Sequence, residues 1–87
     1  MSKSFITPIP TSYLKLTKMK FVEGNLGSTA LFTFTDTQNP LKHTEVCMPR
    51  ADATPAIVES IFRSVNRKNP LALKHLDCLV PYVMRLT

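Results

Sequence analysis

The side chains best suited to hold a metal ion are two histidines and two cysteines, which fall into two local pairs. One pair is His43 with Cys47, the other is His75 with Cys78, and the sequence has no further His or Cys. Two such pairs about thirty residues apart match the outline of a structural zinc site. In a β-strand, however, His43 and Cys47 would lie roughly 13 Å apart, too far to share one ion. We therefore expect no metal and two free thiols, with a Cys47–Cys78 bridge as the alternative.

Motifs for catalysis are missing from the sequence. It has only two glycines and no Gly-rich phosphate loop, no G-x-S-x-G and no H-E-x-x-H. An active site needs at least a base, a partner for it and a pocket, and a chain of 87 residues encloses a pocket of several hundred Å3 only rarely. We expect a protein that is not an enzyme and that uses no small-molecule cofactor.

Positive charge is distributed unevenly along the chain. Eleven Lys and Arg against six Asp and Glu give a formal net charge of +5. Residues 1–22 and 60–76 contain basic residues but no acid, whereas the segment 23–59 carries more acids than bases. Basic side chains bind nucleic acids by neutralising phosphates, and aromatic rings stack on unpaired bases. The sequence thus predicts a small nucleic-acid-binding protein whose ligand is single-stranded DNA or RNA. The phosphate contacts are assigned to Lys15, Lys18, Lys20, Arg63, Arg67, Lys68 and Lys74, and base stacking to Tyr13 and Tyr82.

A second interpretation is a protein-binding module. Basic strand faces and helix backs are also typical of ordinary solvated surface. Apolar side chains such as Leu26 and Leu31 fall outside the expected core, and surplus apolar surface on a small domain marks a partner. The alternative function is therefore a regulatory or inhibitory protein, of the compact kind that viral or mobile-element genomes encode, that docks on a larger protein enzyme. We also expect a homodimer, because the core of so short a chain is small.

The elements that must position these residues begin with three strands. Residues 1–10, with two prolines, are predicted to form an extended arm, and residues 11–87 a single domain. The first strand is predicted over 12–23. In a regular strand, Leu14 and Leu16 would point to one face of the sheet and Met19 and Phe21 to the other. A β-bulge near 17–18 would place all four side chains on one face. Two further strands are predicted over 28–35 and 43–48.

An amphipathic helix is predicted over 55–67. Thr54 suits the N-cap and Pro55 the first helical position, and apolar residues recur with helical spacing from Ile57 to Val65. Residues 71–79 fit either a helical turn or a strand, and 80–86 are predicted to form a terminal strand. The expected fold class is α+β: a sheet-dominated domain of order β-β-β-α-β(β). It is either an OB-like barrel or an antiparallel sheet with one helix.

The sequence shows no apolar stretch of about 20 residues that would cross a membrane, and its N-terminus lacks the pattern of a secretory signal. We expect a cytoplasmic protein without membrane contact.

Overall fold

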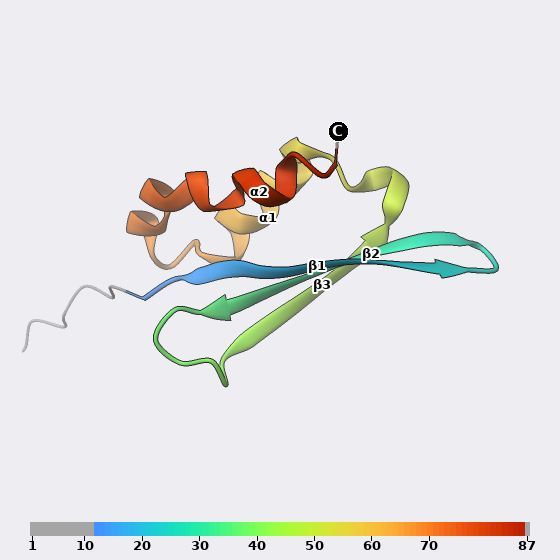
Figure 1. The fold of residues 1–87 in the computed structure, drawn as a ribbon. Helices are drawn as coiled ribbons and strands as arrows, with labels where there is room; N and C mark the ends of the chain where they lie inside the picture. The colour runs from blue at the N-terminus through green and yellow to red at the C-terminus, as the bar shows by residue number, and fades with distance from the viewer. Residues whose placement is uncertain (1–11, 87) are drawn as a thin grey trace, which may run out of the picture.

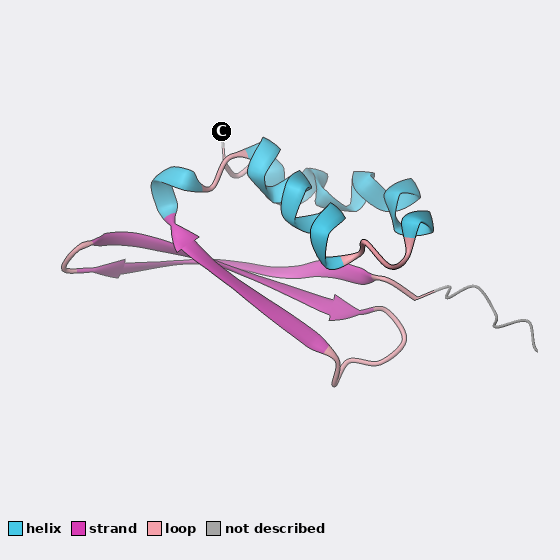
Figure 2. Cartoon of the chain, turned by 180° about the vertical axis from the view of Figure 1, so that it is seen from behind, coloured by secondary structure: helices cyan, strands magenta, loops and turns pink. Residues whose placement is uncertain are grey.

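A computed structural model describes residues 12–86, in which an antiparallel sheet carries the helices on one of its two faces (Figures 1 and 2). The sheet has three strands in the order β1-β2-β3. The strands are β1 (Leu14–Gly24), β2 (Gly27–Asp36) and β3 (His43–Pro49). They are followed by η1 (Arg50–Asp52), α1 (Pro55–Val65), η2 (Pro70–Leu79) and α2 (Val80–Val83). The coarse α+β prediction is confirmed.

The predicted bulge in β1 is confirmed. The pairing of β1 with β2 shifts by one residue between Leu16 and Lys18, so that Thr17 is the extra residue. Leu16 lies opposite Phe34 and Met19 opposite Phe32, which puts both on the side of the sheet that faces the helices. Without the shift, one of the two would point to the other face.

A tight hairpin joins β1 and β2. Gly24 pairs with Gly27 across a turn formed by Asn25 and Leu26. Gly27 has a φ of 119°, a backbone conformation that side chains other than glycine rarely adopt. The hairpin reaches past the helices in Figure 1, and the Arg50 guanidinium lies 4.3 Å above the Phe21 ring near its end.

The core lies between the sheet and the helical layer. Leu16, Phe32 and Phe34 from the sheet are fully buried, as are Val58 and Phe62 from α1. Ala30, Ala53, Ala72 and Leu79 complete the set of buried apolar residues. The apolar stripe predicted on the helix is therefore the core-facing side of α1, although its first member, Ile57, is 40% exposed.

The ends of α1 are fixed by side chains. The Thr54 hydroxyl accepts a hydrogen bond from the Ile57 N–H at 3.3 Å and caps the N-terminus, as predicted. At the other end, the helix ends at Val65, two residues before the predicted limit, and Asn66 is its C-cap. Its side chain accepts from the Leu14 N–H at 2.8 Å and donates to the Leu14 carbonyl at 3.0 Å. The Asn66 amide thus holds the end of α1 against the start of β1.

The predicted terminal strand over 80–86 is wrong. Residues 80–83 form the short helix α2, which directly follows the 3-10 turns of η2. Pro81 is tolerated in this first turn because the first N–H groups of a helix need no partner within it. Leu79, Val83 and Leu86 recur at helical spacing and pack against the core, which an extended segment would not allow.

The OB-like barrel is not confirmed, because the described residues form an open sheet of three strands. The arm expected over 1–10 lies outside the described residues. Within 12–86, none of the helices has the length and apolar character needed to cross a membrane.

Candidate nucleic-acid interface

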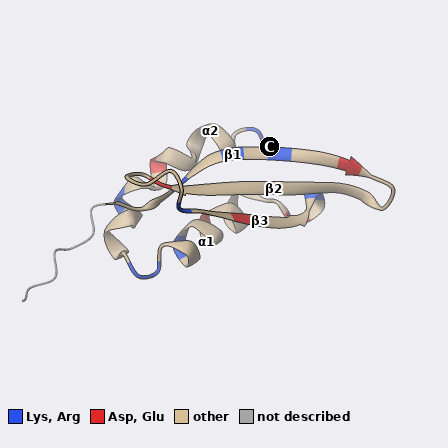
Figure 3. Ribbon diagram, turned by 90° about the horizontal axis from the view of Figure 1, so that it is seen from below, with Lys and Arg blue, Asp and Glu red and all other residues tan. Residues whose placement is uncertain are grey.

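The strand register places three lysines in a row on the face of the sheet away from the helices, the side from which Figure 3 is viewed. Lys15, Lys18 and Lys20 lie opposite Thr35, Thr33 and Leu31 of β2, which all point to the same side. Lys15 and Lys18 are three residues apart, so in a regular strand they would point to opposite faces. The bulge at Thr17 therefore brings Lys15 into line with the other two.

We call this surface the open face. Apart from the three lysines and the apolar Val22, Leu31 and Pro49, its side chains are short or polar, and the β3 residues are aligned with those of β2. The face consists of Lys15, Lys18, Lys20, Val22, Thr29, Leu31, Thr33, Thr35, His43, Glu45, Cys47 and Pro49. The Thr17 hydroxyl, at the bulge, lies 2.9 Å from that of Thr35 and donates to the Thr33 carbonyl at 3.2 Å. The open face holds one acid, Glu45, against three lysines.

A shallow depression of about 130 Å3 lies in the middle of the open face. It is lined by Lys18 and Lys20 on one side, by Leu31 and Thr33 at its base, and by Glu45 on the other side. All three charged residues are exposed. The depression can receive a small polar group, such as a phosphate, next to two ammonium groups.

Two of the basic residues predicted from the sequence belong to the helical layer instead. Arg63 lies on α1, where it forms an ion pair with Glu59 at 2.8 Å, the pairing expected from their spacing. Lys74 lies on η2. Both are exposed and lie in the layer on the far side of the sheet from the three lysines. The two acid-free blocks of the sequence therefore do not merge into one basic face.

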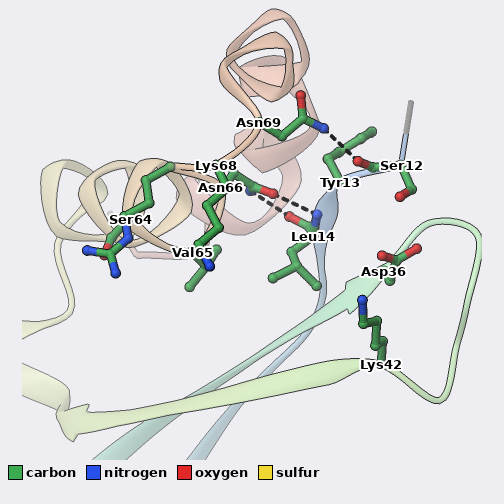
Figure 4. Close-up of a pocket in the computed structure, with 11 residues that line it drawn as sticks. Ser12, Tyr13, Leu14, Asp36, Lys42, Ser64, Val65, Asn66, Lys68 and Asn69 are labelled. Atoms are coloured by element: carbon green, nitrogen blue, oxygen red, sulfur yellow. Dashed lines mark hydrogen bonds between the residues drawn. The ribbon is translucent and has the colours of Figure 1, made fainter. Parts of the chain in front are cut away.

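Arg67 and Lys68 line a pocket at one end of the sheet, which we call the end pocket (Figure 4). The end pocket has a volume of about 410 Å3 and is lined by a third basic residue, Lys42, together with one acid, Asp36. Asn66 forms part of its wall, and Asn69 donates to the Ser12 carbonyl at 2.6 Å. These contacts hold the loop after α1 against the start of β1.

Lys42 is a basic residue that the sequence prediction missed. It lies in the segment 23–59, in which acids outnumber bases, and counting charge by segment therefore hid it. Its neighbour His43 lies in the same row of the sheet as Lys15 and Thr35. The end pocket is thus at the same end of the sheet as Lys15 but on the helical side, because Leu14 and Asp36 alternate with Lys15 and Thr35.

The two tyrosines predicted to stack on bases are not on the open face. The Tyr13 ring is stacked on the His75 ring, with centroids 4.3 Å apart and planes inclined by 4°, and it meets Phe62 edge to face. Tyr82 lies in α2, with the Arg85 guanidinium 5.6 Å from its ring centroid. One face of the Tyr13 ring is therefore already covered by His75.

The two His–Cys pairs lie in different layers. His43 and Cys47 are on the open face, whereas His75 and Cys78 belong to η2 among the helices. Both cysteines are free thiols, and residues 12–86 contain no group of three or more His, Cys, Asp or Glu side chains able to hold a metal. The expected pair of free thiols is confirmed, and the alternative bridge is not formed.

Burial raises the pKa values of two side chains near the start of β1, those of Cys78 and Tyr13. It raises the pKa of the Cys78 thiol above its ordinary value of 9.0, and Lys15 and backbone hydrogen bonds offset part of the rise. Burial also raises the pKa of the Tyr13 phenol above 10.0, and Cys78 and Asp77 add to this effect. A thiol held in its neutral form is a poor nucleophile and a poor metal ligand.

An apolar groove lies between α1 and the C-terminal helical turns. Its volume is about 440 Å3, and its walls include Ala56, Leu76, Val80 and Val83. Met84, which directly follows α2, is 70% exposed.

Comparisons with family models, with curated proteins and with solved structures give no match.

Proposed function

We propose that this chain is a small, non-enzymatic nucleic-acid-binding protein that holds a single strand across its open face. The observation that carries the proposal is the alignment of Lys15, Lys18 and Lys20 on a sheet face that no described helix covers. Three parallel ammonium groups facing solvent form a row of phosphate partners, and the release of counterions from the nucleic acid supplies affinity.

The path of the strand follows from the positions of the other basic residues. The row runs from Lys20 through Lys18 to Lys15, at the end of the sheet where the pocket lined by Lys42, Arg67 and Lys68 lies. A single strand on this path meets the three lysines along the open face and passes round the end of the sheet to reach the basic groups of the end pocket. Arg63 and Lys74 lie off this path, in the helical layer.

The mode of binding differs from that expected from the sequence alone. With Tyr13 stacked on His75 and Tyr82 in α2, the open face offers no Phe, Tyr or Trp ring among the described residues. Affinity then comes from phosphate contacts rather than from base stacking. Binding of this kind depends on salt and is indifferent to base sequence.

The first experiment compares two double variants that remove the same charge from different faces. Lys18→Gln with Lys20→Gln should weaken binding of a fluorescent oligothymidylate about 5- to 30-fold, as expected when two ionic interactions of roughly 0.5–1 kcal/mol each are removed. Arg63→Gln with Lys74→Gln should leave the affinity within about twofold, because neither residue faces the strand. Fluorescence anisotropy at low salt measures both.

Equal weakening by the two double variants would show that binding follows net charge rather than the open face. A duplex of the same length and an oligonucleotide of mixed sequence complete the set. Preference for one base sequence, or for the duplex, would contradict a site built from phosphate contacts with an extended strand.

A second candidate function is docking on a larger protein enzyme. The apolar groove beside α2 and the exposed Met84 favour it, since exposed apolar surface on a small domain marks partner sites. The fluorescence anisotropy measurements of oligonucleotide binding separate the two candidates. Undetectable binding of any oligonucleotide at low salt would leave the docking protein as the surviving candidate.

A further inference from the structure

The outer edge of β3 presents backbone groups without partners in the described chain. The Asp36 N–H donates to the Lys42 carbonyl at 2.8 Å, and antiparallel pairing then alternates residue by residue along β3. Thr44, Val46 and Met48 thus point their N–H and C=O groups toward β2, whereas the remaining residues point theirs outward. Among residues 12–86, the outward backbone groups of His43, Glu45 and Cys47 form no hydrogen bond.

The outer edge of β1 is protected in ways that β3 lacks. Asn66 binds the outward N–H and C=O of Leu14, and η2 packs against β1. Farther along β1 come Lys18 and Lys20, and lysines on an edge strand discourage the addition of another strand. β3 carries no lysine between its first and last residue.

We propose that β3 pairs in antiparallel fashion with β3 of a second copy of this chain, about a two-fold axis at Val46. In this register Glu45 of each copy lies opposite Cys47 of the other, and His43 opposite Pro49. Each Glu45–Cys47 pair can exchange both backbone hydrogen bonds, and each His43–Pro49 pair one, since Pro has no N–H.

Charge and bonding exclude the neighbouring registers. An axis at Glu45 would place two carboxylates directly opposite each other, which is unfavourable in a strand pair. An axis at Cys47 would place Pro49 opposite Glu45 and leave His43 beyond the partner strand, with fewer hydrogen bonds formed. An axis at Thr44 would shorten the paired segment in the same way.

With the two-fold axis at Val46, the core-side side chains of β3 in one copy can also pack against those of β3 in the other. On the core side, Val46 meets Val46 of the second copy and Thr44 meets Met48. Val46 and Met48 are only half-buried in the single chain, and pairing covers more of their surface. The two open faces then point to the same side of one continuous sheet. The pairing requires no nucleic acid and is therefore independent of the proposed function.

The experiment uses proline at an outward position. Cys47→Pro removes an outward N–H that β2 does not use, and Pro49 already occupies the next outward position of the same strand. Cys47→Val is the matched control, since it removes the thiol but keeps the N–H. Light scattering after size-exclusion chromatography should give twice the monomer mass for the wild type and the Val variant, and the monomer mass for the Pro variant.

A wild type that stays monomeric at high concentration, or a Cys47→Pro variant that is folded by circular dichroism and still dimeric, would overturn the proposal.

A second variant tests the register without disturbing the backbone. Glu45→Cys places a new thiol opposite Cys47 of the other copy, at the Cα separation of about 5.5 Å that disulfides allow.

Mild oxidation should convert Glu45→Cys to a covalent dimer that peptide mapping assigns to a 45–47 linkage. The wild type should not form such a dimer, because its two Cys47 thiols are not opposite each other. Failure of Glu45→Cys to cross-link, or a Cys47–Cys47 disulfide in the wild type, would contradict the register.

Discussion

At the scale of single residues, Asn66 joins the helical layer to the sheet. It is buried, with 6% of its surface exposed, and its amide bonds both backbone groups of Leu14 and the Phe62 carbonyl. The sequence indicated only that the helix ends near residue 67. No local pattern shows that an asparagine will reach a strand 52 positions earlier, because that contact exists only after the two elements pack.

Asn66→Ala should lower the free energy of unfolding by roughly 1–3 kcal/mol, since it leaves the Leu14 N–H and carbonyl unpaired at a partly buried site. Urea unfolding followed by circular dichroism measures the change. Ser60→Ala, at an exposed position of α1, is the control and should shift the free energy by less than about 0.5 kcal/mol. Equal effects of the two substitutions would rule out the anchoring role of Asn66.

The raised pKa of Cys78 makes stability depend on alkaline pH. The folded state favours the neutral thiol, so the stabilisation is fully present below the ordinary pKa of 9.0 and disappears as the pH rises through the higher folded pKa. Tyr13 acts in the same direction from 10.0 upward. The melting temperature should therefore fall as the pH rises above about 9, and less steeply in Cys78→Ala. An identical pH profile for this variant would contradict the assignment to Cys78.

At the scale of elements, the sequence predicted those features that the spacing of apolar residues determines. The out-of-step apolar pairs of β1 predicted the bulge, and the apolar stripe with Thr54 and Pro55 predicted α1. Periodicity could not decide the segment from Pro70 onward, because its 3-10 turns, with three residues per turn, are interrupted at His75 and each is too short to give a sustained apolar period. Val80, Tyr82 and Met84 alternate as a strand would, and only the contacts of Leu79, Val83 and Leu86 with the core decide for a helix.

The cap of α1 gives a prediction at this scale. Thr54→Ala removes the acceptor for the Ile57 N–H and should cost about 1 kcal/mol of stability. Thr54→Asp supplies another capping oxygen and should retain the stability of the wild type. Thermal unfolding of both variants checks the pair, and a stable Ala variant would show that packing of Val58 and Phe62 alone fixes the helix.

At the scale of the whole molecule, the position of each charge in space differs from its position in sequence. Residues 60–76 form an acid-free block, yet Arg63 is paired with Glu59 and Lys74 lies on η2, while Arg67 and Lys68 share a pocket with Lys42. Sequence alone placed Lys18 and Lys20 on one side of a strand. The addition of Lys15 depends on the bulge, and the absence of a described helix over the row depends on the packing of the whole chain.

The most direct measurement of the central claim is the salt dependence of single-strand binding. The logarithm of the binding constant should fall linearly with the logarithm of the salt concentration. The slope should be smaller in Lys18→Gln/Lys20→Gln by roughly 1.4, because each phosphate that is neutralised on a single strand accounts for about 0.7. Lack of binding by the wild type at low salt, or the same slope in both proteins, would contradict a phosphate-binding role for the open face.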